Sequence, residues 1–119
     1  MNKGDAAEVT AFLADLYDLI REVVPGDTTL NELAVLAALS LASEKEEPVG
    51  VSEIAERAKV TRATASRLIA HHQSKGAITE GAHPTDGRRK TLPFAGSWLE
   101  LSREWCVQFS ELLKAHEKR

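Results

Sequence analysis

The sequence is poor in cysteine and in aromatic residues. Its 119 residues include one cysteine, Cys106, and only 5% are aromatic. A single cysteine excludes an intramolecular disulfide framework and a four-cysteine zinc site, and it indicates a reducing, cytoplasmic compartment. No apolar run approaches the roughly 20 residues that span a bilayer, and residues 1–5 lack the basic and apolar regions of a secretory signal. The apolar share of 43% suffices for the core of one soluble domain.

Motifs typical of catalysis are lacking as well. The sequence has no glycine-rich phosphate loop, no nucleophile elbow and no His-x-x-x-His pair of metal ligands. His71 and His72 are adjacent, so on a helix they point about 100° apart and cannot chelate one metal ion. We therefore expect a protein without enzymatic activity, cofactor or metal ion.

Basic residues are concentrated in one part of the chain. The segment from Arg57 to Lys90 holds eight basic and two acidic residues and carries +6, whereas the remainder holds seven basic and sixteen acidic residues and carries −9. The net charge of −3 thus conceals a basic segment that suits a surface meeting an anion such as nucleic acid. Chance clustering on a solvated face explains the charge alone equally well.

Apolar periodicity predicts a long helix at each end of the chain. Within residues 5–24 the apolar residues recur at three- and four-residue steps, as in an amphipathic helix, and Pro25-Gly26 ends the pattern. A last helix is predicted from about Ser97 to His116. Cys106 falls on this apolar helix, where we expect a buried, inert thiol rather than a redox sensor.

Between these helices the sequence predicts three more helices and a β-hairpin. The first follows a cap at Thr28 or Thr29, with Glu32 as capping-box partner, and is apolar nearly all round, so it should be the most buried element. Residues 43–50 then read as a solvated connection. A short helix is expected to begin near Ser52, which is placed to cap it. Two short strands near residues 77–80 and 90–94 should flank a turn-rich loop. The predicted fold class is mainly α with a small β-hairpin.

The two central helices have the pattern of a helix-turn-helix. A tight turn at residues 59–61 separates them, Thr61 is placed to cap the second helix, and Gly76 to close it. On a helical wheel one side of this second helix is suited to the core: Ala65, Leu68, Ile69 and His72. The other side combines small residues with side chains that can reach phosphates or base edges: Arg62, Ala63, Ser66, Arg67 and Ala70. An ordinary surface helix or a protein-binding module would also fit this pattern.

The loop that follows the second helix of this helix-turn-helix, the candidate recognition helix, has a basic tip, Asp86-Gly87-Arg88-Arg89-Lys90. A two-stranded wing of this kind can place Arg88 in the minor groove, where negative potential is concentrated. Asp86 can hold the loop by pairing with an arginine or by closing an Asx turn. Arg89 and Lys90 can alternatively protect a strand edge from pairing, and His83 in the same loop can face solvent or a phosphate.

These segments together resemble the multiple-antibiotic-resistance-regulator (MarR) family. The resemblance rests on residues 51–58, 60–69 and 75–78 and on the Asp-Gly-Arg-Arg-Lys run at 86–90. It implies a dimeric winged-helix transcription regulator with DNA contacts from Arg62, Thr64, Ser66 and Arg67, and a wing contact from Arg88 supported by Asp86. The full set that we predict to lie at DNA is Thr61, Arg62, Ala63, Thr64, Ser66, Arg67, Arg88, Arg89 and Lys90.

The sequence also departs from the family pattern. His72 stands where the family usually has a core leucine, and we interpret it as a hydrogen-bonded core histidine. Phe94-Ala95 stands where the family usually has a Leu-Thr step. Many members bind a small effector beside two C-terminal helices; only about 25 residues follow Phe94, so an effector stays unidentified and no ligand-binding residue can be assigned.

The apolar stripe of the last helix is wider than a helix needs to lie on a small domain, which favours a second subunit as its partner. Packing against its own domain is the alternative. The residues predicted to form the dimer interface are Phe12, Leu16, Trp98, Leu101, Trp105, Phe109 and Leu112.

The sequence thus predicts one MarR-like domain over residues 1–119, with dimerisation helices at 5–24 and 95–117 around a winged helix-turn-helix at 28–94. The predicted function is a cytoplasmic transcription regulator, a repressor, that binds a pseudo-palindromic DNA operator as a homodimer. The alternative is a winged-helix module for protein–protein interaction without specific DNA binding.

Overall fold

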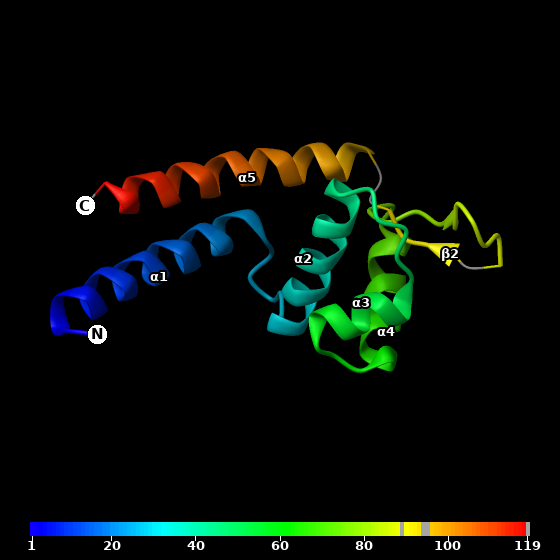
Figure 1. The fold of residues 1–119 in the computed structure, drawn as a ribbon, viewed down its shortest axis with the longest axis horizontal. Coiled ribbons are helices and arrows are strands. Elements are labelled where there is room, and N and C mark those ends of the chain that lie inside the picture. The colour runs from blue at the N-terminus through cyan, green and yellow to red at the C-terminus, as the bar shows by residue number, and fades with distance from the viewer. Residues whose placement is uncertain (89, 94–95, 119) are drawn as a thin grey trace. The chain divides into compact units, whose positions relative to one another are not determined.

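A computed structural model describes residues 1–88, 90–93 and 96–118, with the backbone alone for Ala82 and Ser97. Within this range the chain forms five helices and a two-stranded hairpin (Figure 1). Their bounds are α1 Lys3–Val23, α2 Leu30–Glu44, α3 Val51–Ala58, α4 Arg62–Ser74, β1 Gly81–Ala82, β2 Lys90–Thr91 and α5 Gly96–Glu117. The predicted class, mainly α with a small β-hairpin, is confirmed.

The elements form two compact units. The terminal unit comprises residues 1–28 together with α5 from Ser102 onward, and the central unit comprises Thr29–Leu101. The central unit therefore contains α2, α3, α4, the hairpin and the first turns of α5, and it includes the whole helix-turn-helix.

The core of the central unit is built where α2, α3 and α4 meet. Val35 and Leu39 of α2 and Ile54 of α3 are fully buried. Full burial of one such side chain contributes about 1.5–3 kcal/mol. α2 does not bury its whole circumference, because Leu30 and Leu41 are exposed. The sequence predicts that this helix is buried nearly all round, and the exposure of Leu30 and Leu41 shows that this prediction is wrong for these two side chains.

Helix starts lie close to the predicted residues, but two capping details differ. Thr29 caps α2 by accepting the Glu32 N–H at 3.1 Å. The Glu32 carboxylate bonds to His72, a partner that the predicted capping box did not anticipate. The α3 cap is Gly50 and not Ser52, and the Gly50 N–H donates to the Glu53 carboxylate at 3.4 Å.

The first predicted strand, at residues 77–80, is misplaced, because β1 begins only at Gly81. The apolar side chains of Ala77 and Ile78, which suggested a strand, are buried in the central core instead. The Thr79 N–H donates to the carbonyl of Pro93, and the Leu92 N–H donates to the carbonyl of Val49. The first bond joins the two arms at the base of the hairpin, and the second attaches the β2 arm to the segment before α3. Among the described residues the ladder itself pairs Gly81 with Thr91 and Ala82 with Lys90.

Helix α2 ends with Glu46 in the left-handed region, at φ 55°. The Glu46 N–H donates to the carbonyl of Ser43 and the Glu47 N–H to that of Ala42, which is the hydrogen-bond pattern of a glycine C-cap. A side chain in this conformation costs roughly 1 kcal/mol or more. The connection at residues 43–50 is thus an ordered helix end with local strain.

Because glycine adopts this conformation without strain, we expect Glu46→Gly to raise the free energy of unfolding by about 1 kcal/mol. Urea denaturation of both proteins measures the change. Glu46→Gln is the matched control, since it removes the charge and keeps the strained backbone, and it should leave the midpoint nearly unchanged. A lower midpoint for Glu46→Gly would contradict the strain argument.

Candidate nucleic-acid interface

The turn between α3 and α4 positions the recognition helix. Lys59 adopts a left-handed conformation at φ 59°, and the Val60 N–H donates to the carbonyl of Ala55. Thr61 then caps α4 by accepting the Thr64 N–H at 3.1 Å. The Thr61 hydroxyl donates to the Thr64 hydroxyl at 3.0 Å, so the Thr64 proton can still be donated to a phosphate. The predicted turn and cap are confirmed.

The two faces of α4 are divided as the helical wheel predicts. Ala65, Leu68, Ile69 and His72 are buried. Arg62, Ala63, Ser66, Arg67 and Ala70 are exposed, and Thr64 is half-buried. The helix therefore presents two arginines and a hydroxyl among alanines, whose small side chains allow close approach to a groove.

His72 fastens the recognition helix to α2. Its Nε2 lies 2.9 Å from Oε1 of Glu32, and His72 is 7% exposed. The ring thus replaces the apolar contact of a leucine with a hydrogen bond that depends on the orientation of both helices. The interpretation of His72 as a hydrogen-bonded core residue is confirmed.

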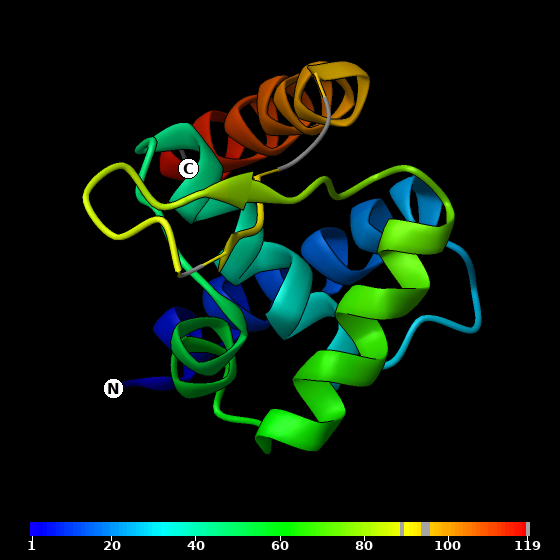
Figure 2. The same ribbon diagram turned by 90° about the vertical axis from the view of Figure 1, so that its right-hand side faces the viewer.

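The wing is a narrow hairpin that extends beyond α2, α3 and α4; its tip is the yellow loop in Figure 2. At its base a Cβ on Gly81 would lie 2.8 Å from Oγ1 of the buried Thr91. Glycine at this position therefore allows the two strands to approach.

The tip of the wing is held by two side chains of its own. Oδ1 of Asp86 accepts the Arg88 N–H at 3.2 Å, which closes an Asx turn, one of the two predicted roles of Asp86. Nδ1 of His83 accepts the N–H groups of Thr85 and Asp86, each at 3.2 Å. His83 therefore bonds to the wing itself through Nδ1, a partner that the sequence did not predict, whereas a solvent or phosphate partner at Nε2 stays a prediction. Arg88 is exposed, and Arg89 lies outside the described residues.

A groove of about 420 Å³ lies between α4, the start of α3 and the base of the wing. Arg62, Ser66 and Gln73 line it from α4, and Glu80 and Lys90 line it from the wing. Nζ of Lys90 is 3.3 Å from Oε2 of Glu80, so the charge of this predicted DNA contact is partly compensated. The lining of the groove mixes polar and apolar side chains and carries both signs of charge.

The basic stretch is also compensated at Arg57. Its Nη2 lies 2.6 Å from Oε2 of Glu47. The hydrogen bond from Arg57 holds the pKa of the Glu47 carboxyl below its ordinary value, and the same bond raises the pKa of the guanidinium. Glu47 lies outside residues 57–90, so its pairing with Arg57 leaves less than +6 of this stretch to face an anion. Glu80, the partner of Lys90, is already counted in the +6.

The residues predicted for the dimer interface fall in both units. Phe12, Leu16, Trp105, Phe109 and Leu112 are half-buried in the terminal unit. Trp98 and Leu101 belong to the central unit, where Trp98 packs against the core.

Inside the terminal unit, His116 joins the two helices. Its Nε2 lies 2.7 Å from Oδ2 of Asp15, and its ring packs edge-on against Phe12. No residue of α1 is buried.

The predicted interface set left out several exposed apolar side chains of the terminal unit. Val9, Leu13 and Tyr17 are 46%, 40% and 58% exposed and recur every four residues on α1. On α5, Val107 and Leu113 are also exposed. Their apolar character is visible in the sequence, but which side of the helix packs within the unit is not. Cys106 is exposed too, so the expectation of a buried thiol is wrong in the single chain.

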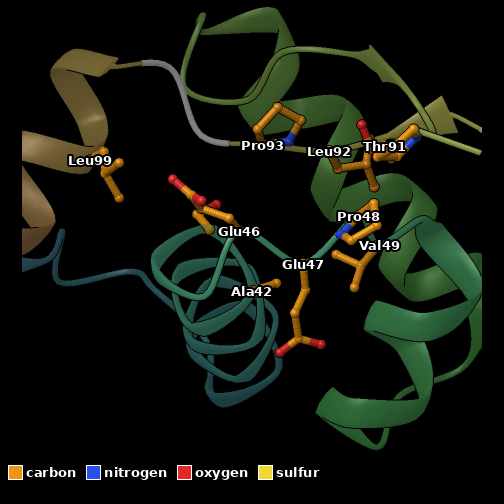
Figure 3. A pocket seen from close by; sticks show the side chains of 11 residues that line it. Ala42, Glu46, Glu47, Pro48, Val49, Thr91, Leu92, Pro93 and Leu99 are labelled. Carbon is orange, nitrogen blue, oxygen red and sulfur yellow. The ribbon is translucent and has the colours of Figure 1, made fainter.

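Figure 3 shows a second cavity of the central unit, about 260 Å³ in volume. Apolar side chains dominate its lining, among them Val49, Leu92, Pro93 and Leu99. Glu46 also lines it, and the carboxylate of Glu47 points away from it (Figure 3). The volume is below the roughly 300 Å³ at which sites for drug-sized ligands begin. The cavity therefore identifies no ligand. No cluster of His, Cys, Asp or Glu among the described residues could hold a metal ion.

Comparison with known proteins tests the resemblance. A family model described as the MarR family matches residues 26–89, more than half of the chain. The chain belongs to the MarR family. This confirms the predicted family and winged helix-turn-helix, and it makes the protein a DNA-binding transcription regulator of a generally non-enzymatic class. No curated protein matches the sequence.

Solved structures of MarR regulators share the fold. An S. aureus MepR–DNA complex is 18% identical, with a TM-score of 0.70 over 92% of this chain and 88% of that chain. The PcaV transcriptional regulator from Streptomyces coelicolor, in complex with its natural ligand, is 23% identical, with a TM-score of 0.58 over 97% and 77%. A MarR-like regulator from Thermotoga maritima is 20% identical, with a TM-score of 0.65 over 100% and 83%.

One further finding concerns membranes. None of the helices in the described ranges combines the length and apolar character needed to cross a bilayer.

Proposed function

We propose that this MarR protein is a homodimeric repressor that binds a pseudo-palindromic operator. In each half-site the outer face of α4 enters the major groove and the wing enters the flanking minor groove. The observation that carries the proposal is that Arg62, Ser66 and Arg67 are exposed on one face of α4, in the same unit as the exposed Arg88. The similar S. aureus MepR structure is a complex with DNA, which supports the same use of the fold.

The contacts have different roles in this proposal. Arg67 presents a planar fork that matches guanine, whereas the hydroxyls of Thr61, Thr64 and Ser66 suit phosphates near the helix start. Ala63 contributes by its small size. Lys90 exchanges Glu80 for a phosphate on binding, and Arg88 reads groove width. Arg89 is proposed as a further phosphate contact from the sequence alone.

The terminal unit supports the homodimer. A unit of two helices without a buried residue on α1 cannot remove enough apolar surface from water to be stable by itself. The exposed stripe of Val9, Leu13 and Tyr17 supplies such a surface, and in a twofold dimer the same stripe of a second copy can cover it. Phe12, Leu16, Trp105, Phe109 and Leu112 lie on the same pair of helices and extend this interface.

Twofold symmetry determines the form of the operator. Two recognition helices related by a dyad read inverted half-sites about one helical turn apart, roughly 10 base pairs centre to centre. Repression then needs only occupancy, since a bound dimer excludes other proteins from the same base pairs.

Selection from a random DNA pool with the full chain tests the proposal, combined with sedimentation velocity. We expect an inverted repeat with this spacing and a dimer in solution. Absence of any enriched motif would favour the protein-docking module. Elution of the purified protein from heparin only at raised salt would support the DNA-binding surface, and elution at low salt would favour docking.

The wing gives a separate prediction. Arg88→Ala should weaken operator binding by about 1 kcal/mol, mainly on A·T-rich flanks, whose narrow minor groove concentrates the potential that attracts arginine. Thermal melting should be unchanged because Arg88 is exposed. Titrations on operators with A·T and G·C flanks measure the difference, with Arg21→Ala on α1 as the charge-matched control. Equal affinity of wild type and Arg88→Ala on both flanks would remove the wing from the interface.

A further inference from the structure

The wing tip depends on one ring nitrogen. Nδ1 of His83 accepts two consecutive backbone N–H groups, those of Thr85 and Asp86, and lies 3.3 Å from Oγ1 of Thr85. His83 is half-buried, whereas residues 84–88 are exposed. Pro84 follows directly and favours an extended backbone at His83. The ring therefore caps the turn in the way that an asparagine or aspartate side chain closes an Asx turn.

This cap continues to the arginine. His83 holds the N–H of Asp86, and the Asp86 carboxylate holds the N–H of Arg88 at 3.2 Å. Outside residues 86–88, no atom of the described part of the chain lies within 4 Å of a Cβ built on Gly87, and residues 84–88 are exposed, so packing contributes little to holding the tip. The backbone at Arg88 is thus positioned by a relay of two side chains.

The relay works in only one protonation state of the ring. Nδ1 can accept two N–H groups only through its lone pair, which requires the neutral ring with its proton on Nε2. In the imidazolium form Nδ1 becomes a donor, and the N–H groups of Thr85 and Asp86 cannot accept from it. Among these contacts of Nδ1, the Thr85 hydroxyl oxygen is the one acceptor. Protonation therefore removes two hydrogen bonds and allows at most one.

We propose that His83 is a positioning residue for DNA binding: its neutral ring holds the wing in the form that presents Arg88, and its protonation releases the wing. This inference rests on the proposed function, because protonation of His83 lowers DNA affinity only if Arg88 contacts DNA.

Electrostatic attraction alone predicts a pH dependence of DNA binding opposite to the one that the proposal requires. On the wing the neighbouring charges are Asp86, Arg88 and the Lys90–Glu80 pair. Pro84, next to His83, lines the cavity of Figure 3 together with Glu46 and Glu47. Glu47 is bound to Arg57, and Leu99, the α5 residue that lines the cavity, is apolar. By charge alone, a protonated His83 near a phosphate would strengthen binding as the pH falls. The proposal requires weaker binding, so the sign of the effect separates the two.

Operator titrations from pH 8 to pH 5.5 test this with His83→Asn and His83→Ala. Asparagine keeps an acceptor at a similar place and does not titrate. We expect wild type and His83→Asn to bind equally at pH 8, and His83→Ala to bind about three- to tenfold more weakly, the cost of ordering a free loop. At pH 5.5 wild type should lose affinity relative to His83→Asn by a similar factor. His71, exposed on α4, is present in all three proteins, so its contribution cancels in the comparison.

Two results would overturn the proposal: full affinity of His83→Ala at pH 8, or the same pH dependence in wild type and His83→Asn. NMR of the full chain without DNA keeps the test independent of the proposed function. The His83 ring should be the Nε2–H tautomer at pH 8, and the amide shifts of Thr85 and Asp86 should titrate together with the ring. If the amides titrate but no DNA binds, the proposed function fails. If DNA binds but the amides do not follow the ring, the inference about His83 fails.

Discussion

Replacing both Leu13 and Tyr17 with glutamate should convert the dimer to monomer and lower operator affinity by about 100-fold or more. The two side chains are 40% and 58% exposed on α1 in the single chain, so the charges are solvated in the monomer and unpaired in the dimer, where burial is costly. A monomer also loses the gain of linking two half-sites, which is worth about 10²–10⁴ in affinity. Sedimentation velocity and operator titration measure the two effects.

This pair is a better test than Trp105 and Phe109, which are half-buried within their own unit. Charges there would disturb the unit itself. Leu30→Glu is the matched control, because Leu30 is an 81% exposed leucine of the central unit, and it should leave both dimer and affinity intact. If the double variant melts early, Leu13→Ala, which adds no charge, should still raise the dimer dissociation constant. A double variant that remains a dimer and binds its operator would place the interface elsewhere.

Arg67→Ala should weaken specific operator binding by about 1–3 kcal/mol if its guanidinium reads a base. The base preference at one position of each half-site should relax at the same time. The side chain is exposed on α4, so the melting temperature should not change. Titration on the selected operator and on its single-base variants measures the loss and the altered preference.

Two variants separate base reading from charge. Arg67→Lys keeps the charge but not the planar fork, so it should resemble Arg67→Ala if Arg67 reads a base. If Arg67 contacts only phosphate, Arg67→Lys should bind like wild type. Arg67→Ala should then lose affinity on every sequence, with a salt slope smaller by about one unit. Arg21→Ala, on α1, should change neither quantity. Wild-type affinity and salt slope in Arg67→Ala would exclude Arg67 from the interface.

The sequence by itself determined the helix-turn-helix and its outward face. The Thr61 cap, the Gly76 end with its φ of 77° and the buried side of α4 depend on residues three or four apart. Such interactions lie within one turn of the chain, so composition and spacing specify them before any tertiary contact forms. The Asx turn of Asp86 onto Arg88 is equally local.

Tertiary structure decided what depends on distant partners. The Glu32 carboxylate bonds to His72, which lies 40 positions further along the chain. The capping pattern around Thr29 therefore could not show that the Glu32 carboxylate contacts α4. Ala77 and Ile78 lie in a segment whose residue types are typical of a strand, but both side chains are buried in the central core and β1 begins only at Gly81. On α1 and α5 the apolar face is wider than the contact between two helices, and only packing decides that Leu13, Tyr17 and Cys106 remain exposed. Periodicity shows that a face is apolar; which surface covers it is set by shape complementarity between elements far apart in sequence.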